Sequence, residues 1–200
     1  MKKLSLLLIF LLFMSFSVSA IEQGDFSIGV SFAAGGRYDN VRMCVASPAG
    51  FPGGFAMEPA GLVLEYGVTD NFGIGAYIPL GRPLIFALNT QMLQFLPELV
   101  FSIHVPITDT LDFVLHPALG ASLHYGPDYL SDADNRGEDF FAAGPRVSLL
   151  GGVEIKHSSG QEFVFGLKPY FEYLFSDYRS GYVIGGEFDF QYRYNIKSDA

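Results

Sequence analysis

The stretch "TDTLDFVLHPALGASLHYG" (108–126) alternates between two kinds of side chain. Every second position is almost always apolar: Leu111, Phe113, Leu115, Pro117, Leu119, Ala121, Leu123 and Tyr125. The positions between them are mostly small or polar: Asp112, Val114, His116, Ala118, Gly120, Ser122 and His124. A period of two is typical of a β-strand, because successive side chains point to opposite faces of the sheet. The stretch therefore predicts a long strand with one apolar and one polar face.

The same alternation recurs along the chain and predicts seven further strands. They cover residues 25–34, 60–69, 72–80, 91–107, 146–156, 162–176 and 182–196. The connections 35–59, 81–90 and 126–145 are long and rich in Gly, Pro, Asp or Asn, whereas 70–71, 108–110 and 157–161 are short. Long loops that alternate with short turns indicate an antiparallel up-and-down meander.

The length of the strands and the chemistry of their polar face favour a membrane barrel. Several predicted strands run for about 15 residues, whereas strands of globular proteins usually have about 3–10. The polar face carries Gly, Ala and Ser with isolated charges, which fit the crowded interior of a narrow barrel. A sheet that spans hydrocarbon must close, since every backbone group needs a bond. We therefore expect an all-β, eight-stranded antiparallel up-and-down transmembrane β-barrel. The alternative is a secreted soluble sandwich or a lipocalin-like barrel.

The first 20 residues, "MKKLSLLLIFLLFMSFSVSA", have the pattern of a secretory signal peptide. Two lysines precede an apolar run, and Val18-Ser19-Ala20 provides small residues for cleavage. We expect cleavage after Ala20 and a barrel domain over 21–200, with an uncleaved anchor as the alternative. Loss of Lys2 and Lys3 leaves 10 of the 12 basic residues against 21 acidic ones. This balance argues against nucleic acid as a partner, because phosphates need Lys and Arg.

The chain resembles the small eight-stranded outer-membrane barrels of the OmpA-like and OmpW-like kind over residues 21–200. The resemblance rests on the export signal, on "LEYGVTDNFGIGAY" (64–77) as a hairpin, and on "LPELVFSIHVPI" (96–107) with "DFVLHPALGASLHYG" (112–126) as paired strands. It implies export to the outer membrane of a diderm bacterium, with outer-membrane lipid and the assembly machinery as partners. The chain departs from the family where Ala121-Ser122 replaces a second glycine, and it ends on Ala200 rather than on an aromatic residue.

Three prolines fit the predicted barrel poorly. Pro97, Pro117 and Pro169 fall on the lipid-facing register inside predicted strands. Proline cannot donate to a strand ladder, and a closed barrel has no free edge to hold it. We expect bulges or locally broken pairing at these positions.

Charged residues on the polar face predict a network inside the barrel. Counted from the short turns, Arg146, Glu172 and Glu187 fall at similar heights on neighbouring strands. Lys168 falls nearer to Glu154 and Asp189. A charge in a narrow interior needs a partner. The hypothesis is a lumenal network of these six residues that plugs the barrel.

Histidines supply the other candidate chemistry. His157, Ser159 and Glu172 resemble the base, nucleophile and acid of outer-membrane lipid A deacylases, although "HSSG" (157–160) also suits a hairpin turn. His104, His116 and His124 face the predicted interior as polar groups or as metal ligands, and no close-spaced His or Cys pair supports a metal. We therefore expect no catalytic site, cofactor or metal.

The long loops offer two further candidates. Phe51 and Phe55 flank Pro52-Gly53-Gly54 and would form a binding tip or fold back over the barrel mouth. The acidic stretch 128–139 lacks the spacing of a calcium loop and is interpreted as solvated. The single Cys44 has no partner for an intramolecular disulfide.

These observations predict a non-enzymatic integral outer-membrane barrel. It would be structural to the envelope or act as a narrow conduit for small solutes, apolar ones included. The first alternative is a surface ligand-binding or adhesion protein that acts through loops 35–59 and 126–145. The remote alternative is a lipid A-modifying hydrolase.

Overall fold

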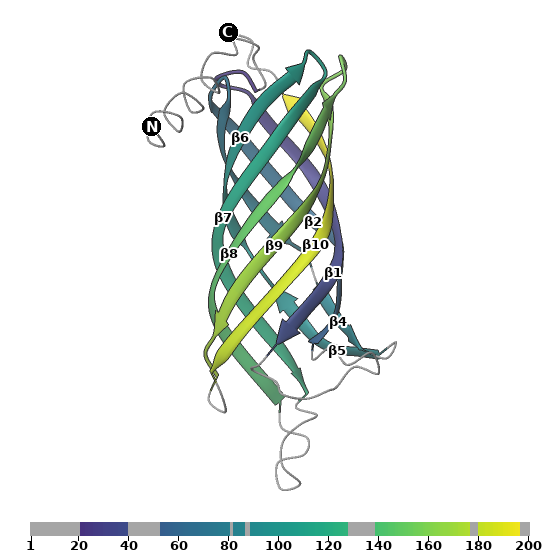
Figure 1. Cartoon of the computed structure of the whole chain (residues 1–200), viewed down its shortest axis with the longest axis vertical. Coiled ribbons are helices and arrows are strands. Elements are labelled where there is room, and N and C mark those ends of the chain that lie inside the picture. The colour runs from purple at the N-terminus through teal and green to yellow at the C-terminus, as the bar shows by residue number, and fades with distance from the viewer. Residues whose placement is uncertain are drawn as a thin grey trace, which may run out of the picture.

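The strands of the protein close into a barrel and are tilted relative to its long axis (Figure 1). The computed structural model describes residues 21–39, 53–80, 82–86, 89–127, 139–176 and 180–196. The strands are β1 (Phe26–Asp39), β2 (Gly53–Thr69), β3 (Phe72–Pro79), β4 (Arg82–Phe86), β5 (Asn89–Phe95), β6 (Glu98–Thr108), β7 (Leu111–Pro127), β8 (Asp139–Lys156), β9 (Gln161–Leu174) and β10 (Gly181–Ile196). Strand β1 pairs antiparallel with β2 on one side and with β10 on the other, so the sheet closes on itself.

Ten strand segments fill eight positions around this barrel. Strands β3 and β4 both pair with β2, so they are two parts of one barrel strand. Strands β5 and β6 both pair with β7 and form the next barrel strand in two parts. All pairings are antiparallel, and the predicted eight-stranded barrel is confirmed. The predicted signal peptide 1–20 lies outside the described residues and stays a prediction.

The predicted boundaries of the long loops were wrong. Strand β1 continues to Asp39 and β2 begins at Gly53, so both ends of the expected loop 35–59 are strand. Residues 126–127 and 139–145 likewise belong to β7 and β8, and the expected loop 81–90 holds β4 and the start of β5. The reason is that backbone pairing with a neighbour extends a strand beyond the apolar band, where Gly and polar residues break the pattern but not the ladder.

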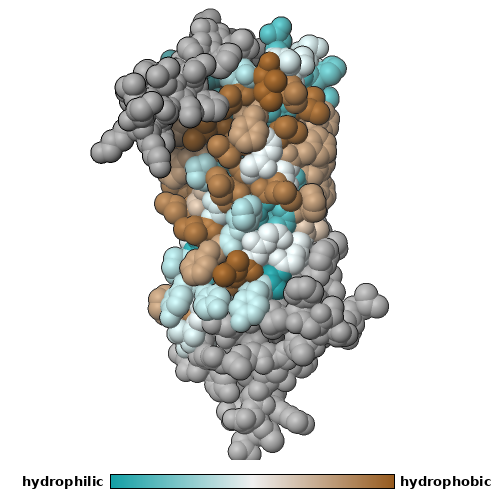
Figure 2. All heavy atoms as spheres, in the orientation of Figure 1, coloured by the Kyte–Doolittle hydropathy of each residue, from teal (hydrophilic) through white to brown (hydrophobic). Residues whose placement is uncertain are grey.

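The two faces of the barrel wall are as the alternation predicts. On β7 the side chains of Asp112, His116 and His124 are buried, whereas Leu119 is 56% and Tyr125 50% exposed. Exposed Phe, Leu, Ile, Val and Tyr side chains cover the outer wall, and Figure 2 shows apolar side chains gathered between the two ends of the molecule. The apolar set therefore faces lipid and the polar set faces the interior. Among the described residues, no helix is long and apolar enough to cross a membrane.

The prolines are accommodated by interrupted pairing with an unchanged register. The β6–β7 ladder pairs Val100 with Ala118 and resumes at Ile103 with Leu115, so it skips Pro117. The β8–β9 ladder skips Pro169 in the same way, between its pairs Ser148–Tyr170 and Gly151–Leu167. Residues 96–97 form the break between β5 and β6, which places Pro97 outside any strand. Each of these prolines therefore lies at a local interruption of the strand ladder, where no backbone N–H donor is needed.

A bulge in β2 changes which side chains reach the interior. The β1–β2 register shifts between the pairs Ser31–Gly61 and Ala33–Glu58, so β2 holds one extra residue there. Such an insertion reverses the alternation of faces. Glu58 is consequently buried, and it accepts hydrogen bonds from Ser31 Oγ at 2.9 Å and from Tyr77 Oη.

Candidate functional site

Charged side chains fill the interior of the barrel. In the described ranges, ten acidic side chains and four basic ones are buried. The acidic ones are Asp25, Glu58, Glu65, Glu98, Asp112, Glu154, Glu162, Glu172, Glu187 and Asp189, and the basic ones are Arg37, Arg146, Lys168 and Arg193. A buried charge without a partner costs several kcal/mol, so the contacts of each group decide what the interior can do.

A first cluster is organised around Arg146 of β8. Its Nε donates to Glu98 Oε1 at 2.8 Å, and its Nη1 donates to Glu172. Its Nη2 lies 3.6 Å from Glu187 Oε1. One guanidinium thus meets carboxylates from β6, β9 and β10, across the width of the lumen. We call these four residues, together with Lys168, the Arg146 cluster.

Lys168 and two tyrosines complete the packing of this cluster. The Nζ of Lys168 donates to Glu98 Oε2 at 2.5 Å and lies 4.2 Å from the centre of the Tyr77 ring. The Tyr170 ring lies 3.9 Å from the Arg146 guanidinium carbon. Cations over aromatic faces are stabilised further when water is excluded. The cluster therefore fills its section of the barrel with paired charge and with aromatic surface.

The structure brings together one half of the network expected from the sequence. Arg146, Glu172 and Glu187 meet, as their heights on neighbouring strands suggest. The close ion pair of Lys168 is with Glu98, while Asp189 lies near enough to interact with Lys168 electrostatically and Glu154 belongs to a different group of side chains. Heights counted along neighbouring strands did not reveal the pair of Lys168 with Glu98. In a barrel of tilted strands, side chains of β6 also meet side chains of β8 and β9 across the lumen.

Glu98 is the residue that the sequence reasoning missed. Its position on the polar face of its strand is evident from the alternation. Its partners Arg146 and Lys168 are 48 and 70 residues away in the chain, and they come from strands that do not pair with β6. Only the closed geometry places one carboxylate between two cations.

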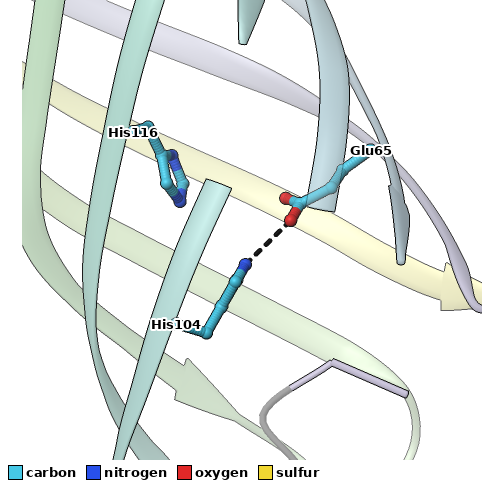
Figure 3. Close-up of side chains that lie close together, drawn as sticks. All are labelled: Glu65, His104 and His116. Carbon is cyan, nitrogen blue, oxygen red and sulfur yellow. Dashed lines mark hydrogen bonds and ion pairs between the residues drawn. The ribbon is translucent and has the colours of Figure 1, made fainter. Parts of the chain in front are cut away.

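A second cluster surrounds His104 of β6, nearer the short turns. His104 Nδ1 lies 2.8 Å from Glu154 Oε2. Its Nε2 lies 2.8 Å from Glu65 Oε1, as Figure 3 shows. Arg193 Nη1 donates to the other oxygen of Glu65. The ring of His116 lies 5.7 Å from the ring of His104, centre to centre. We call these five residues the His104 cluster; Glu154, expected beside Lys168, belongs here.

The contacts of His124, the third histidine in the interior, are structural and not catalytic. His124 Nε2 lies 2.9 Å from Ser122 Oγ and 2.9 Å from Glu172 Oε2. A relay from acid through base to nucleophile needs the acid and the serine on opposite ring nitrogens, whereas here both contact the same one. All three side chains are buried, so no substrate reaches the serine. The set therefore joins the Arg146 cluster through Glu172 rather than forming a catalytic triad.

The deacylase-like residues are not brought together. His157 and Ser159 lie in the exposed β8–β9 turn, where His157 Nδ1 is 2.8 Å from Ser159 Oγ. Glu172 is buried in the barrel and is held by Arg146 and His124. An acid bound in this way cannot orient a histidine in the turn.

The loop candidates fall largely outside the described part of the chain. Phe51, Cys44 and residues 128–138 lie there. The backbone of Phe55 belongs to β2 and is paired with Gly36 of β1, so the expected loop tip does not include it.

A closed antiparallel sheet with an apolar outer wall and a polar, filled interior defines a class of protein. A barrel of eight strands has an interior just wide enough to be filled by side chains. Closure satisfies the backbone in lipid, and the alternation supplies the outer and inner surfaces. The protein is a small integral membrane β-barrel.

The solved structures with a similar fold are bacterial outer-membrane barrels. The crystal structure of Neisserial surface protein A matches with a TM-score of 0.60 at 14% identity, over 86% of this chain and 99% of that one. The crystal structure of the outer-membrane protein OprG from Pseudomonas aeruginosa matches with a TM-score of 0.50 at 11% identity, over 91% of this chain and all of that one (100%). No protein-family model and no curated protein matches the chain. The fold is the one that these outer-membrane barrels have, which agrees with the outer-membrane location that the sequence predicts.

Proposed function

We propose that the protein is a structural, non-enzymatic barrel of the outer membrane whose lumen is closed by its own charged side chains. One observation carries this proposal. The cavity between the two clusters, lined by Glu65, Glu98, His116, Lys168 and others, has a volume of only about 20 Å³. A single water needs about 10–15 Å³ of such space, so this cavity holds about one water molecule and is far too small for a nutrient-sized solute.

The bonding of the Arg146 cluster supports a permanent rather than a loose plug. Glu98, Glu172 and Lys168 are buried, and each makes a charge-assisted contact with a side chain on a different strand. Opening a channel would require two or more of these contacts to break in a low-dielectric interior. Breaking one buried pair typically costs about 3–5 kcal/mol.

Planar-bilayer conductance of the refolded barrel tests the proposal. The native protein should give no steady conductance. A variant that combines Arg146→Ala, Glu98→Ala and Lys168→Ala should conduct, because it removes the side chains that fill the section. Phe188→Ala, which truncates a lipid-facing side chain, is the matched control and should stay closed. Steady conductance by the native protein would refute the plug, and so would a closed triple variant that folds.

Two pairs of histidine and serine in the described ranges bear on the proposal that the barrel is not an enzyme. Neither His157 with Ser159 nor His124 with Ser122 has the acid, base and nucleophile in a productive order. Incubation of the refolded protein with lipopolysaccharide tests this point. Release of fatty acid by the native protein, and not by Ser159→Ala, would contradict the assignment.

A groove on the outer wall favours a second candidate function, the handling of small apolar solutes. The groove has a volume of about 420 Å³ and is mostly apolar. Its lining consists of Phe32, Phe165, Phe188 and Phe190, the small residues Ala33, Ala34 and Gly166, and the buried acids Glu58 and Asp189. It opens on the lipid-facing side, so an apolar solute could occupy it without crossing the plug. Uptake of an apolar fluorophore by liposomes should then depend on the barrel and fall in Ala34→Leu, which fills the groove. Uptake that is equal in empty liposomes would exclude this candidate.

The adhesion alternative depends on residues that the structure does not describe. The central parts of both long loops, 40–52 and 128–138, lie there. Exchange of each loop for a short Gly-Ser linker, followed by a binding assay on whole cells, remains its test.

A further inference from the structure

We propose that His104, His116 and Glu65 form a binding site for a divalent transition-metal ion of the zinc type, inside the barrel near the short turns. Spacing along the sequence argued against a metal, because no two of these residues are close in the chain. The closed sheet brings them together from β6, β7 and β2. One ligand atom from each residue lies within 4.8 Å of the others.

His116 provides the observation that points to a ligand. Its side chain is 4% exposed, and its Nε2 has no hydrogen-bond partner among the described residues. A buried ring nitrogen without a partner is costly, so this position calls for an ion or a water. Figure 3 shows His116 beside the hydrogen-bonded pair of Glu65 and His104.

The neighbours of the proposed ligands have the arrangement that metal sites use. A ligating histidine almost always donates its second ring N–H to a carboxylate, which fixes its tautomer and orientation. His104 meets this condition at Nδ1, which lies 2.8 Å from Glu154 Oε2. Its Nε2 lies 2.8 Å from Glu65 Oε1, and an ion bound here would replace the proton between these two atoms, which is released to solvent. The second oxygen of Glu65 is held by Arg193, which orients the carboxylate.

The site also has room for one more ligand. The cavity of about 20 Å³ is lined by Glu65 and His116, and it is also bordered by the hydroxyl-bearing Ser102. It can hold one water molecule. Two imidazoles, one carboxylate and one water are a set that zinc accepts in tetrahedral geometry, with bonds of about 2.0–2.2 Å. The 2.8 Å between His104 Nε2 and Glu65 Oε1 must lengthen slightly for an ion to sit between them.

The charge of the interior favours a cation at this position. In the described ranges, buried Asp and Glu side chains number ten against four buried Lys and Arg side chains and three buried histidines. A neighbouring combination of His104, Asp112 and Glu154 also has ligand atoms in reach, but Asp112 lies 3.0 Å from Lys156 and Glu154 is bonded to His104. Carboxylate oxygens of Asp112 and Glu154 also lack hydrogen bonds, but the set with His116 is the better candidate because two imidazoles and one carboxylate are a donor set that zinc sites use.

Metal counting on the refolded, tag-free barrel tests the proposal. The chain has four histidines, so each can be replaced separately. Chelator-treated protein is titrated with Zn²⁺ alone, and bound zinc is measured by elemental mass spectrometry. The native barrel should retain one zinc ion per chain, and His116→Gln should weaken binding about tenfold or more.

Two histidines serve as matched controls. His124→Gln removes a buried histidine from the same face of β7, and His157→Gln removes the exposed one; both variants should still bind one zinc ion. The proposal is overturned if the native barrel retains no zinc, if His116→Gln binds as tightly as the native protein, or if His157→Gln abolishes binding.

A spectroscopic measurement on the native protein covers the case in which His116→Gln does not refold. Co²⁺ should replace zinc and give the intense visible absorption of a four-coordinate centre, which added Zn²⁺ should remove. The weak spectrum of hydrated Co²⁺ would overturn the proposal. Heat-dependent gel mobility reports whether each variant is folded.

Discussion

Removal of Arg146 should destabilise the barrel by leaving its carboxylate partners without their shared cation. In Arg146→Met, Glu98 keeps Lys168 at 2.5 Å and Glu172 keeps His124 at 2.9 Å, so both retain part of their compensation. Loss of one partner from a buried pair costs about 3–5 kcal/mol, and we expect the lower end of that range. The double variant Arg146→Met/Glu172→Gln should lose about 1–3 kcal/mol less stability than the sum of the two single variants. The reason is that Glu172→Gln removes a carboxylate that Arg146→Met has left without its arginine.

The assay is urea-dependent folding into lipid vesicles, followed by the mobility of the unheated protein on a gel. The chain has no tryptophan, so the usual fluorescence signal is absent and the gel reports the folded fraction. As a control, Arg146→Met is combined with Ser27→Ala, which removes a hydrogen bond to Glu162 near the short turns, and these two losses should add. Additive losses for Arg146 with Glu172 would refute the coupling and with it the Arg146 cluster as an energetic unit.

Three further predictions concern the orientation of the side chains in the wall, one turn and the membrane location. Leu119→Arg should cost about 2–4 kcal/mol if Leu119 lies near the bilayer midplane, whereas Ser122→Ala loses one buried hydrogen bond worth about 1 kcal/mol; equal losses in the refolding titration would mean that the assigned faces are wrong. Gly160→Ala should cost about 1–2 kcal/mol, because Gly160 has a φ of 83° in the β8–β9 turn; an unchanged unfolding midpoint would contradict this. Cell fractionation should place the native protein in the outer-membrane fraction with heat-dependent gel mobility, and recovery from the soluble periplasm would contradict the membrane location.

The alternation of side chains was sufficient to determine the architecture. Residues 111–125 show which face meets lipid, because a period of two assigns every side chain to one side of the sheet. Closure follows from the membrane, since an open edge would leave backbone groups without bonds in hydrocarbon. Neither argument requires knowledge of which side chains meet across the lumen.

The ends of the strands were decided by pairing and not by composition. Residues 82–86 are strand because β4 pairs with β2 and β5, although Gly81 before the segment and Pro83 within it favour a loop. Glu58 faces inward only because a bulge in β2 reverses the alternation, and nothing in a one-dimensional pattern indicates that insertion.

Which charges meet was decided by the tertiary structure alone. The sequence places Glu98, His104 and Glu65 on the polar faces of their strands, and it stops there. Strand tilt and the curvature of a closed sheet then bring Glu98 to Arg146 and His104 to Glu65, at separations of 48 and 39 residues. Side chains inside a narrow barrel contact partners across the lumen as well as beside them, so their pairing depends on the shear of the whole sheet and not on any local pattern.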